Sequence, residues 1–256
     1  ERKKPRREDD ALLQYTQFSY EALSAATGSF SDAQLVGEGA FGRVFRCTLP
    51  GFGFQAAVKV FEAADDSALA EAFAKEAQEL SRHPHPHIVR MFGASADGPR
   101  LCLVTEYMAG GSAQARLEAD PPLSWRERIV AAEGAVRALV FLPSHLNKVH
   151  RDVKPTNILL GRPLRAQTAV LCDFGLTRTL QAPSGKTEKT SIAAGTAAFM
   201  SHEAMQGVIT PKMDIYAVGV TLLCLVAGRR AEGDAAGQGL VMEMEDALEE
   251  LEGGDA

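Results

Sequence analysis

The sequence has 256 residues, of which 46% are hydrophobic and 23% charged, and its formal net charge is −6. This composition is typical of a globular protein that can bury a substantial core in one large or two modest domains. The acidic balance excludes a nucleic-acid-binding protein that neutralises phosphates over its whole surface, so we expect no nucleic-acid partner. The four cysteines include no close pair, which excludes the usual zinc spacings and suits a reducing compartment: Cys47, Cys102, Cys172 and Cys224.

Basic residues crowd the start of the sequence: Arg2, Lys3, Lys4, Arg6 and Arg7. A run of this kind is usually a solvated tail, and the alternative is a juxtamembrane segment on the cytoplasmic side of a preceding transmembrane helix. The longest apolar run, Ile215 to Gly228, is too short to span a bilayer and predicts a buried helix. We therefore expect a cytoplasmic protein or the intracellular domain of a membrane receptor.

The spacing of apolar residues predicts a small sheet interrupted by one helix. Alternating segments predict strands over 43–48 and 56–61, joined by turns that contain glycine. From 66 to 81 the period becomes helical, with Phe73, Ala77 and Leu80 on one face. Residues 88–92 and 101–107 are again strand-like.

A flexible Gly-rich break at 109–112 follows these strands, and after it the chain turns helical. Ser124 and Glu127 form a capping-box pattern that begins a helix, which we expect to end near Pro143. Short apolar runs at 158–160 and 170–172 predict two small strands. These strands would brace the charged loops beside them.

Three short segments carry the chemistry: Gly37-Glu-Gly39-Ala-Phe-Gly42-Arg-Val44, His150-Arg-Asp152-Val-Lys154-Pro-Thr-Asn157 and Asp173-Phe174-Gly175. A glycine-rich hairpin lets backbone N–H groups approach phosphates. Asn157 and Asp173 are oxygen ligands of the kind that Mg²⁺ prefers, and Asp152 is suited to accept a hydroxyl proton. Each segment alone is weak evidence, but their order and spacing together indicate phosphoryl transfer.

Two lysines and one glutamate complete this set. Lys59 is the single cation of the segment 56–61, where a charged head group needs a partner such as a phosphate. Glu76, on the following helix, could orient Lys59, although taken alone it is interpreted as a solvated helix residue. Lys154 could neutralise the moving phosphate.

On these segments the chain resembles a eukaryotic protein kinase over about residues 34 to 230. The resemblance implies an α+β fold of two lobes, a small β-rich one with a helix and a larger, mainly helical one, with ATP and Mg²⁺ as cofactors. It implies Asp152, Lys154, Lys59 and Glu76 as catalytic residues, Asn157 and Asp173 as metal ligands, and Asp214 as a brace for the catalytic loop. The ATP-binding residues that it implies are Gly37, Gly39, Gly42, Val44, Ala57, Lys59, Thr105, Glu106, Met108 and Leu159.

The segment from Phe18 to Thr27, followed by Phe30 and Ser31, is similar to the start of plant receptor-like, Pelle and interleukin-receptor-associated kinases of the tyrosine-kinase-like group. In that group Lys154 favours Ser/Thr specificity. The segment after Asp173 is similar to an activation loop, with phosphorylation-site positions at Thr187, Thr190 and Ser191. The resemblance implies a protein substrate with Ser/Thr acceptors, regulation by activation-loop phosphorylation, and an upstream receptor or adaptor as partner.

The resemblance divides the chain into an N-terminal extension (1–33), a first lobe (34–108), a second lobe (109–230) and an acidic tail (231–256). We expect this tail to be flexible, although Met244, Leu248 and Leu251 allow one weak helix.

Three departures from the family pattern leave an alternative open. Ser201-His202-Glu203 stands where the family has Ala-Pro-Glu, Phe141-Leu142-Pro143 lies where a histidine is usual, and the sequence ends in an acidic segment instead of further helices. The alternative is a kinase-like scaffold, a pseudokinase or truncated kinase, that binds nucleotide or partners without efficient turnover. A dinucleotide-dependent oxidoreductase is disfavoured because its glycines open a helix, whereas these lie between strand-like segments.

Overall fold

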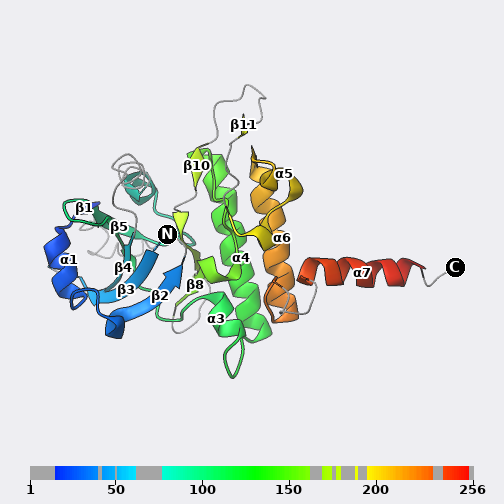
Figure 1. The fold of residues 1–256 in the computed structure, drawn as a ribbon, viewed down its shortest axis with the longest axis horizontal. Coiled ribbons are helices and arrows are strands. Elements are labelled where there is room, and N and C mark those ends of the chain that lie inside the picture. The colour runs from blue at the N-terminus through cyan, green and yellow to red at the C-terminus, as the bar shows by residue number, and fades with distance from the viewer. Residues whose placement is uncertain are drawn as a thin grey trace, which may run out of the picture. The chain divides into compact units, whose positions relative to one another are not determined.

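The computed structural model describes residues 15–39, 42–49, 51–61, 77–161, 169–174, 177–179, 188–189, 195–232 and 239–253. The chain divides into two compact units, the first comprising Glu1–His85 and Val89–Tyr107, and the second Pro86–Ile88 and Met108–Ala256. The first unit is built on a sheet, and the second is mainly helical (Figure 1). The predicted α+β class is therefore confirmed.

Six of the described strands form the sheet of the first unit in the order β1-β5-β6-β4-β3-β2. Neighbouring strands are antiparallel except β1 and β5, which are parallel. The strands are β1 (Thr16–Gln17), β2 (Leu35–Gly39), β3 (Gly42–Thr48), β4 (Gln55–Val60), β5 (Met91–Ser95) and β6 (Cys102–Glu106). The strands predicted over 43–48 and 56–61 are confirmed, and that over 101–107 is confirmed to within one residue at each end.

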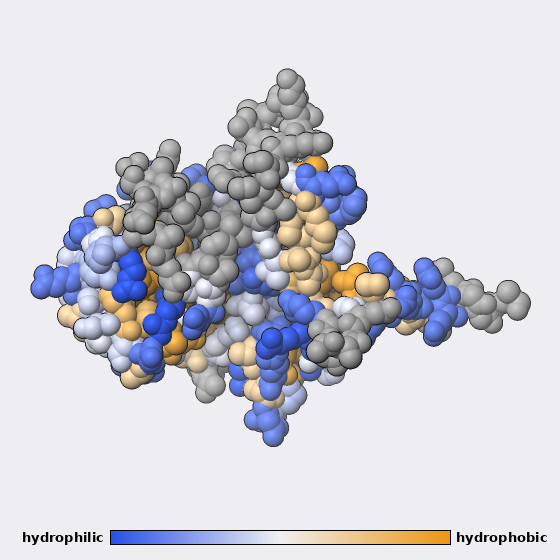
Figure 2. All heavy atoms as spheres, in the orientation of Figure 1, coloured by the Kyte–Doolittle hydropathy of each residue, from blue (hydrophilic) through white to orange (hydrophobic). Residues whose placement is uncertain are grey.

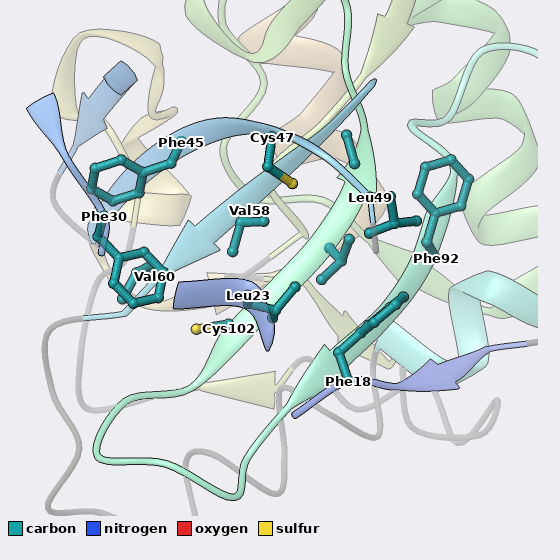
Figure 3. Close-up of a cluster of buried hydrophobic side chains, with 12 residues drawn as sticks. Phe18, Leu23, Phe30, Phe45, Cys47, Leu49, Val58, Val60, Phe92 and Cys102 are labelled. Carbon is teal, nitrogen blue, oxygen red and sulfur yellow. The ribbon is translucent and has the colours of Figure 1, made fainter. Parts of the chain in front are cut away.

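The core of this sheet is apolar and rich in aromatic rings (Figure 3). Phe30 packs edge-on against Phe45, with ring centroids 5.5 Å apart, and Phe54 packs similarly against Phe92. The residues labelled in Figure 3 are Phe18, Leu23, Phe30, Phe45, Cys47, Leu49, Val58, Val60, Phe92 and Cys102.

The segment before the glycine-rich hairpin contributes to this core. It contains β1, helix α1 (Tyr20–Ala26) and the 3-10 turn η2 (Asp32–Gln34), and Ser19 caps α1 by accepting a hydrogen bond from a backbone N–H. A Cβ atom at Gly93 would lie 1.8 Å from the Thr16 carbonyl oxygen, so glycine allows β1 to approach β5. Leu23 is fully buried, so this segment packs into the compact first unit.

The predicted helix over 66–81 falls largely outside the described residues. Its described end, 77–82, is helical, and Ala77 and Leu80 are buried as expected. The strand predicted over 88–92 is wrong in its boundaries, because β5 begins at Met91. Ile88 itself belongs to the second unit, where it forms an isolated bridge with Leu171.

Helix α4 (Trp125–Phe141) begins at the predicted capping box. The Ser124 hydroxyl accepts from the Glu127 N–H (3.4 Å), and the Glu127 carboxylate accepts from the Ser124 N–H (2.8 Å). The helix ends near Pro143 as predicted, in the π-type turn η3 (Leu142–Leu146). By length and apolar composition, Trp125–Leu146 could cross a membrane, but its small residues Ala131, Gly134, Ala135 and Ala138 are buried in the second unit.

Small sheets support the loops of the second unit. The two strands predicted beside the charged segments are confirmed as β8 (Ile158–Leu160) and β9 (Ala169–Leu171), which pair with each other. The remaining elements are α3 (Ala113–Leu117), β7 (Lys148–Val149) paired with β10 (Arg178–Thr179), η4 (Pro155–Asn157), β11 (Glu188–Lys189) paired with β12 (Val208–Ile209), η6 (Ala197–Phe199) and α5 (His202–Met205).

Helix α6 (Pro211–Ala227) corresponds to the longest apolar run, and Gly228 ends it in a left-handed conformation. The prediction of a buried helix is correct for one face only. Ile215 and Val226 are exposed because α6 contacts the rest of the unit along the opposite face, which includes Val220 and Cys224. Helix α7 (Leu240–Gly253) is the helix that the spacing of apolar residues in the acidic tail allows.

Candidate active site

The glycine-rich hairpin is formed by β2 and β3, with Gly39 opposite Gly42. Gly42 has φ +133°, and a Cβ atom there would lie 2.0 Å from the Val60 carbonyl oxygen. The sheet therefore requires glycine at this position. A Cβ atom would meet nothing within 4 Å at Gly39 and only Val44, at 3.9 Å, from Gly37, so packing does not explain these two glycines.

The strands place the other candidate residues of the first unit in register. Lys59 of β4 lies opposite Val44 of β3 and Leu103 of β6, and Ala57 lies opposite Thr105. The Lys59 ammonium lies 5.3 Å from the Phe61 ring centroid. Glu76 lies outside the described residues.

Glu106 ends β6. Its carboxylate accepts a hydrogen bond from the Arg90 N–H (2.8 Å). Burial raises the pKa of this carboxyl, against the opposing effects of that hydrogen bond and the Arg90 charge. Met108 follows two residues later as part of the second unit.

In the second unit, Asp214 of α6 holds the loop that carries the histidine, arginine and aspartate of the second motif. Its two carboxylate oxygens accept the backbone N–H groups of His150 (2.7 Å) and Arg151 (2.8 Å). Burial raises the pKa of Asp214, and these two hydrogen bonds and the Arg151 charge oppose that rise. The bracing implied by the kinase resemblance is thus present. Arg151 is held at φ +75°, a conformation that needs such support.

Asp152 lies at the centre of a buried polar network. One carboxylate oxygen accepts from the Thr196 hydroxyl (2.8 Å), and the other pairs with the Lys154 ammonium (2.9 Å) and accepts from the Asn157 amide (3.0 Å). Burial by itself would raise the pKa of Asp152, but Lys154 and Thr196 outweigh it, so the pKa is lowered. The network therefore keeps Asp152 ionised.

His150 joins this network to the Asp173-Phe174 segment. Its Nδ1 accepts from the Asp152 N–H (3.3 Å), and its Nε2 then donates to the Cys172 carbonyl (2.9 Å). The Phe174 ring packs edge-on against the imidazole, with centroids 4.9 Å apart. Asp173, between these contacts, has φ +62°.

The donor chemistry of Asn157 and Asp173 fits a magnesium ion. The nitrogen of the Asn157 amide donates to the Asp152 carbonyl and carboxylate, so the amide oxygen is the group left to act as a ligand. The Asp173 carboxylate supplies a second oxygen donor of the kind that Mg²⁺ prefers. Among the described residues no three His, Cys, Asp or Glu side chains cluster as a metal site. Phosphate oxygens and water commonly complete such a coordination shell.

The structure adds Thr196 to the candidate residues. Its hydroxyl accepts from the Lys154 ammonium (2.5 Å) and donates to Asp152, so it links the two. The sequence gives no signal for Thr196, because this residue lies 44 positions from Asp152 in a Gly/Ala/Thr stretch without a distinctive pattern. Leu159 lies on β8 and bridges to Ser112, whereas Thr187, Thr190 and Ser191 lie outside the described residues.

A protein-kinase-domain family model matches residues 30–251, from the aromatic core of the first unit into α7. The chain belongs to the protein kinase domain family. The predicted family and two-lobed kinase fold are therefore confirmed, and the match extends beyond the range of about 34 to 230 on which the resemblance was based.

This kinase domain is 37% identical to the "Probable serine/threonine-protein kinase PBL5" of Arabidopsis thaliana over 222 residues, which cover 84% of the chain and 51% of that protein. It is also 37% identical to "U-box domain-containing protein 51" of the same plant, over 91% of the chain and 31% of that protein. "U-box domain-containing protein 33" matches at 37% over 85% of the chain and 26% of its own length. The chain thus spans from about a quarter to about half of these relatives.

Proposed function

We propose that this kinase domain is a serine/threonine protein kinase that transfers the γ-phosphate of Mg-ATP to Ser and Thr hydroxyls. The observation that carries the proposal is the network around Asp152. It holds an ionised carboxylate beside a lysine, an asparagine and a threonine hydroxyl. This arrangement suits phosphoryl transfer, which depends mainly on positioning and charge compensation.

Each residue has a proposed role. Asp152 orients the acceptor hydroxyl and accepts its proton, and Lys154 compensates charge on the transferred phosphoryl group. Asn157 and Asp173 hold Mg²⁺, which when bound neutralises charge on the phosphates. Thr196 positions Asp152 and Lys154 relative to each other.

In the first unit, Gly37, Gly39 and Gly42 let the hairpin backbone approach the phosphates, and Lys59 pairs with them, oriented by Glu76. Room for a side chain at Gly37 and Gly39 supports this role, since packing leaves those glycines unexplained. Val44, Ala57, Thr105 and Glu106 of this unit are proposed to contact adenine, and the kinase resemblance assigns the same role to Met108 and Leu159 of the second unit.

Regulation by activation-loop phosphorylation is part of the proposal. A phosphate on Thr187, Thr190 or Ser191 would pair with Arg151, whose backbone N–H is already held by Asp214. Substituting the three residues together by alanine is expected to depress turnover. Unchanged turnover in that variant would contradict regulation by phosphorylation of these residues.

The relatives support Ser/Thr specificity, since PBL5 carries the name of a probable serine/threonine-protein kinase. We further propose a protein substrate, an upstream receptor or adaptor, and a location in the cytoplasm or in the intracellular part of a receptor. The chain covers only about half or less of each relative, so substrate, partners and location are proposed as properties of the whole protein.

The experiment is Mg²⁺-dependent transfer of labelled γ-phosphate from ATP to the protein itself and to a generic Ser/Thr substrate. Incorporation on Ser or Thr is expected, and Asp152→Asn should abolish it. Asp246→Asn, an exposed site on α7, is the control and should leave it unchanged. Thr196→Ala should lower the rate and Thr196→Ser should retain most of it, because serine keeps the bridging hydroxyl.

A nucleotide-binding scaffold is the second candidate, favoured by the Ser201-His202-Glu203 segment. Ser201 there caps α5 by accepting from the Ala204 N–H (3.3 Å), and Glu203 is exposed. A thermal-shift measurement separates the candidates. Stabilisation by ATP that does not depend on Mg²⁺, with no phosphate transferred, would favour the scaffold function and contradict the proposal of an active kinase.

A further inference from the structure

Helix α7 is attached to the second unit by its first turn. Leu240 is buried in a cluster that includes Val220, Cys224 and Ala231, and its N–H donates to the Ala231 carbonyl (2.9 Å). Glu243 pairs with Arg229. Beyond this turn the helix runs away from α6 (Figure 1). Its later part is therefore open to a partner.

One face of α7 is apolar; it begins at Val241, which packs against the same cluster, and continues into the later part of the helix. Val241, Met244 and Leu248 recur at intervals of three and four residues, the spacing by which one helix packs along another. Met244 is 40% exposed and Leu248 is 56% exposed. Met242 is also exposed, but at about 100° per residue it lies well away from this seam. We call the two exposed members of this face, Met244 and Leu248, the α7 seam.

The charges around the seam have one sign. Every charged residue of 240–250 is acidic, namely Glu243, Glu245, Asp246, Glu249 and Glu250. Figure 2 shows apolar residues gathered where α7 begins and hydrophilic residues over its later part. A second copy of α7 laid along the seam would bring like charges together, which disfavours self-pairing. The complementary surface is an apolar seam bordered by Lys or Arg.

We propose that α7 is a docking helix for a basic amphipathic helix of a partner protein. The partner's apolar residues would cover the α7 seam, and its Lys or Arg side chains would face Glu245 and the neighbouring carboxylates. A seam of this length buries a small area, so the association is weak and sensitive to salt. The proposal does not rest on kinase activity, and a failure of either leaves the other standing.

The test uses the full chain and a fluorescent synthetic peptide of about 14 residues, a helix of four turns, with Leu at the seam positions and Lys beside them. Fluorescence anisotropy should show saturable binding that weakens as salt is raised. Two control peptides keep the helix, one with Ser in place of Leu and one with Glu in place of Lys. Neither should bind comparably, and equal binding by the Ser peptide would overturn the proposal because charge alone would explain it.

Matched variants of the protein locate the contact. Met244→Gln with Leu248→Gln should weaken binding by about tenfold or more, the loss expected when about 1.4 kcal/mol of contact energy is removed. Met242→Gln should have little effect. Glu245→Lys borders the seam and should weaken binding more than Asp246→Lys, which changes net charge equally but lies on the far side of the helix. Circular dichroism checks that each variant stays folded.

Three further outcomes would overturn the proposal. The first is no saturable binding at low salt, and the second is equal weakening by the seam variant and by Met242→Gln. The third is a dimer of the chain, measured by light scattering, that the seam variant dissociates, since a second copy would then occupy the seam.

Discussion

The two units of this kinase domain differ in whether their candidate functional residues are themselves part of the buried interior. The core of the first unit is apolar, and Gly39 and Lys59 lie on strands whose stability comes from that core. In the second unit the candidate residues are themselves buried and bonded to one another, as Asp152 and Asn157 show. In the first unit, a substitution should therefore be able to change function without changing stability. In the second unit, a substitution of a candidate residue should change both.

The strongest test of this coupling is Asp214→Asn. An amide cannot accept both backbone N–H groups, and its NH₂ group would face a donor. We expect a loss of about 3–5 kcal/mol in the free energy of unfolding, together with loss of phosphoryl transfer. Urea denaturation and the transfer assay measure the two effects. Retention of both properties would show that the loop does not depend on Asp214.

The apolar core of the first unit is tested by Leu23→Ala. Leu23 is fully buried, and its truncation should lower the free energy of unfolding by about 2–5 kcal/mol. Glu21→Ala, an exposed position on the same helix, is the control. If Leu23→Ala unfolds at the same denaturant concentration as the unsubstituted protein, the segment before the hairpin does not contribute to the core.

Two glycines of the hairpin provide a matched pair that separates packing from ligand binding. Gly42→Ala places a Cβ atom against the Val60 carbonyl at a strained φ, so we expect a loss of about 1–3 kcal/mol in stability. Gly39→Ala meets nothing within 4 Å and should leave the thermal midpoint nearly unchanged while it weakens ATP binding. Equal thermal midpoints for the two variants would contradict this difference.

The smallest expected effect is a pH dependence. Because the pKa of Asp152 is lowered in the folded protein, its ionised form contributes stability above the ordinary pKa of about 3.9, and this contribution is lost as the pH falls. The stability advantage over Asp152→Asn should thus shrink on acidification from pH 6 towards about pH 3. Denaturation of both proteins across that range measures it, and a constant difference would count against an ionised Asp152.

Local signals account for what was predicted well. The capping box at Ser124 began α4 where expected, because both of its hydrogen bonds join residues three positions apart. The end of that helix was similarly marked by Pro143. The strand beginning at Ile88 was misplaced, since an apolar run does not distinguish strand pairing from a single bridge to Leu171.

The sequence by itself determined the family and the candidate residues, because glycine spacing and the Asp152, Asn157 and Asp173 motifs are read over a few neighbouring positions. Only the tertiary structure decided that Thr196 links Asp152 to Lys154 and that Leu23 belongs to the core of the first unit. It also decided that α6 leaves one face exposed. The physical reason is distance along the chain. Hydrogen bonds and core contacts between residues tens of positions apart depend on the path of the whole backbone, which no local pattern encodes.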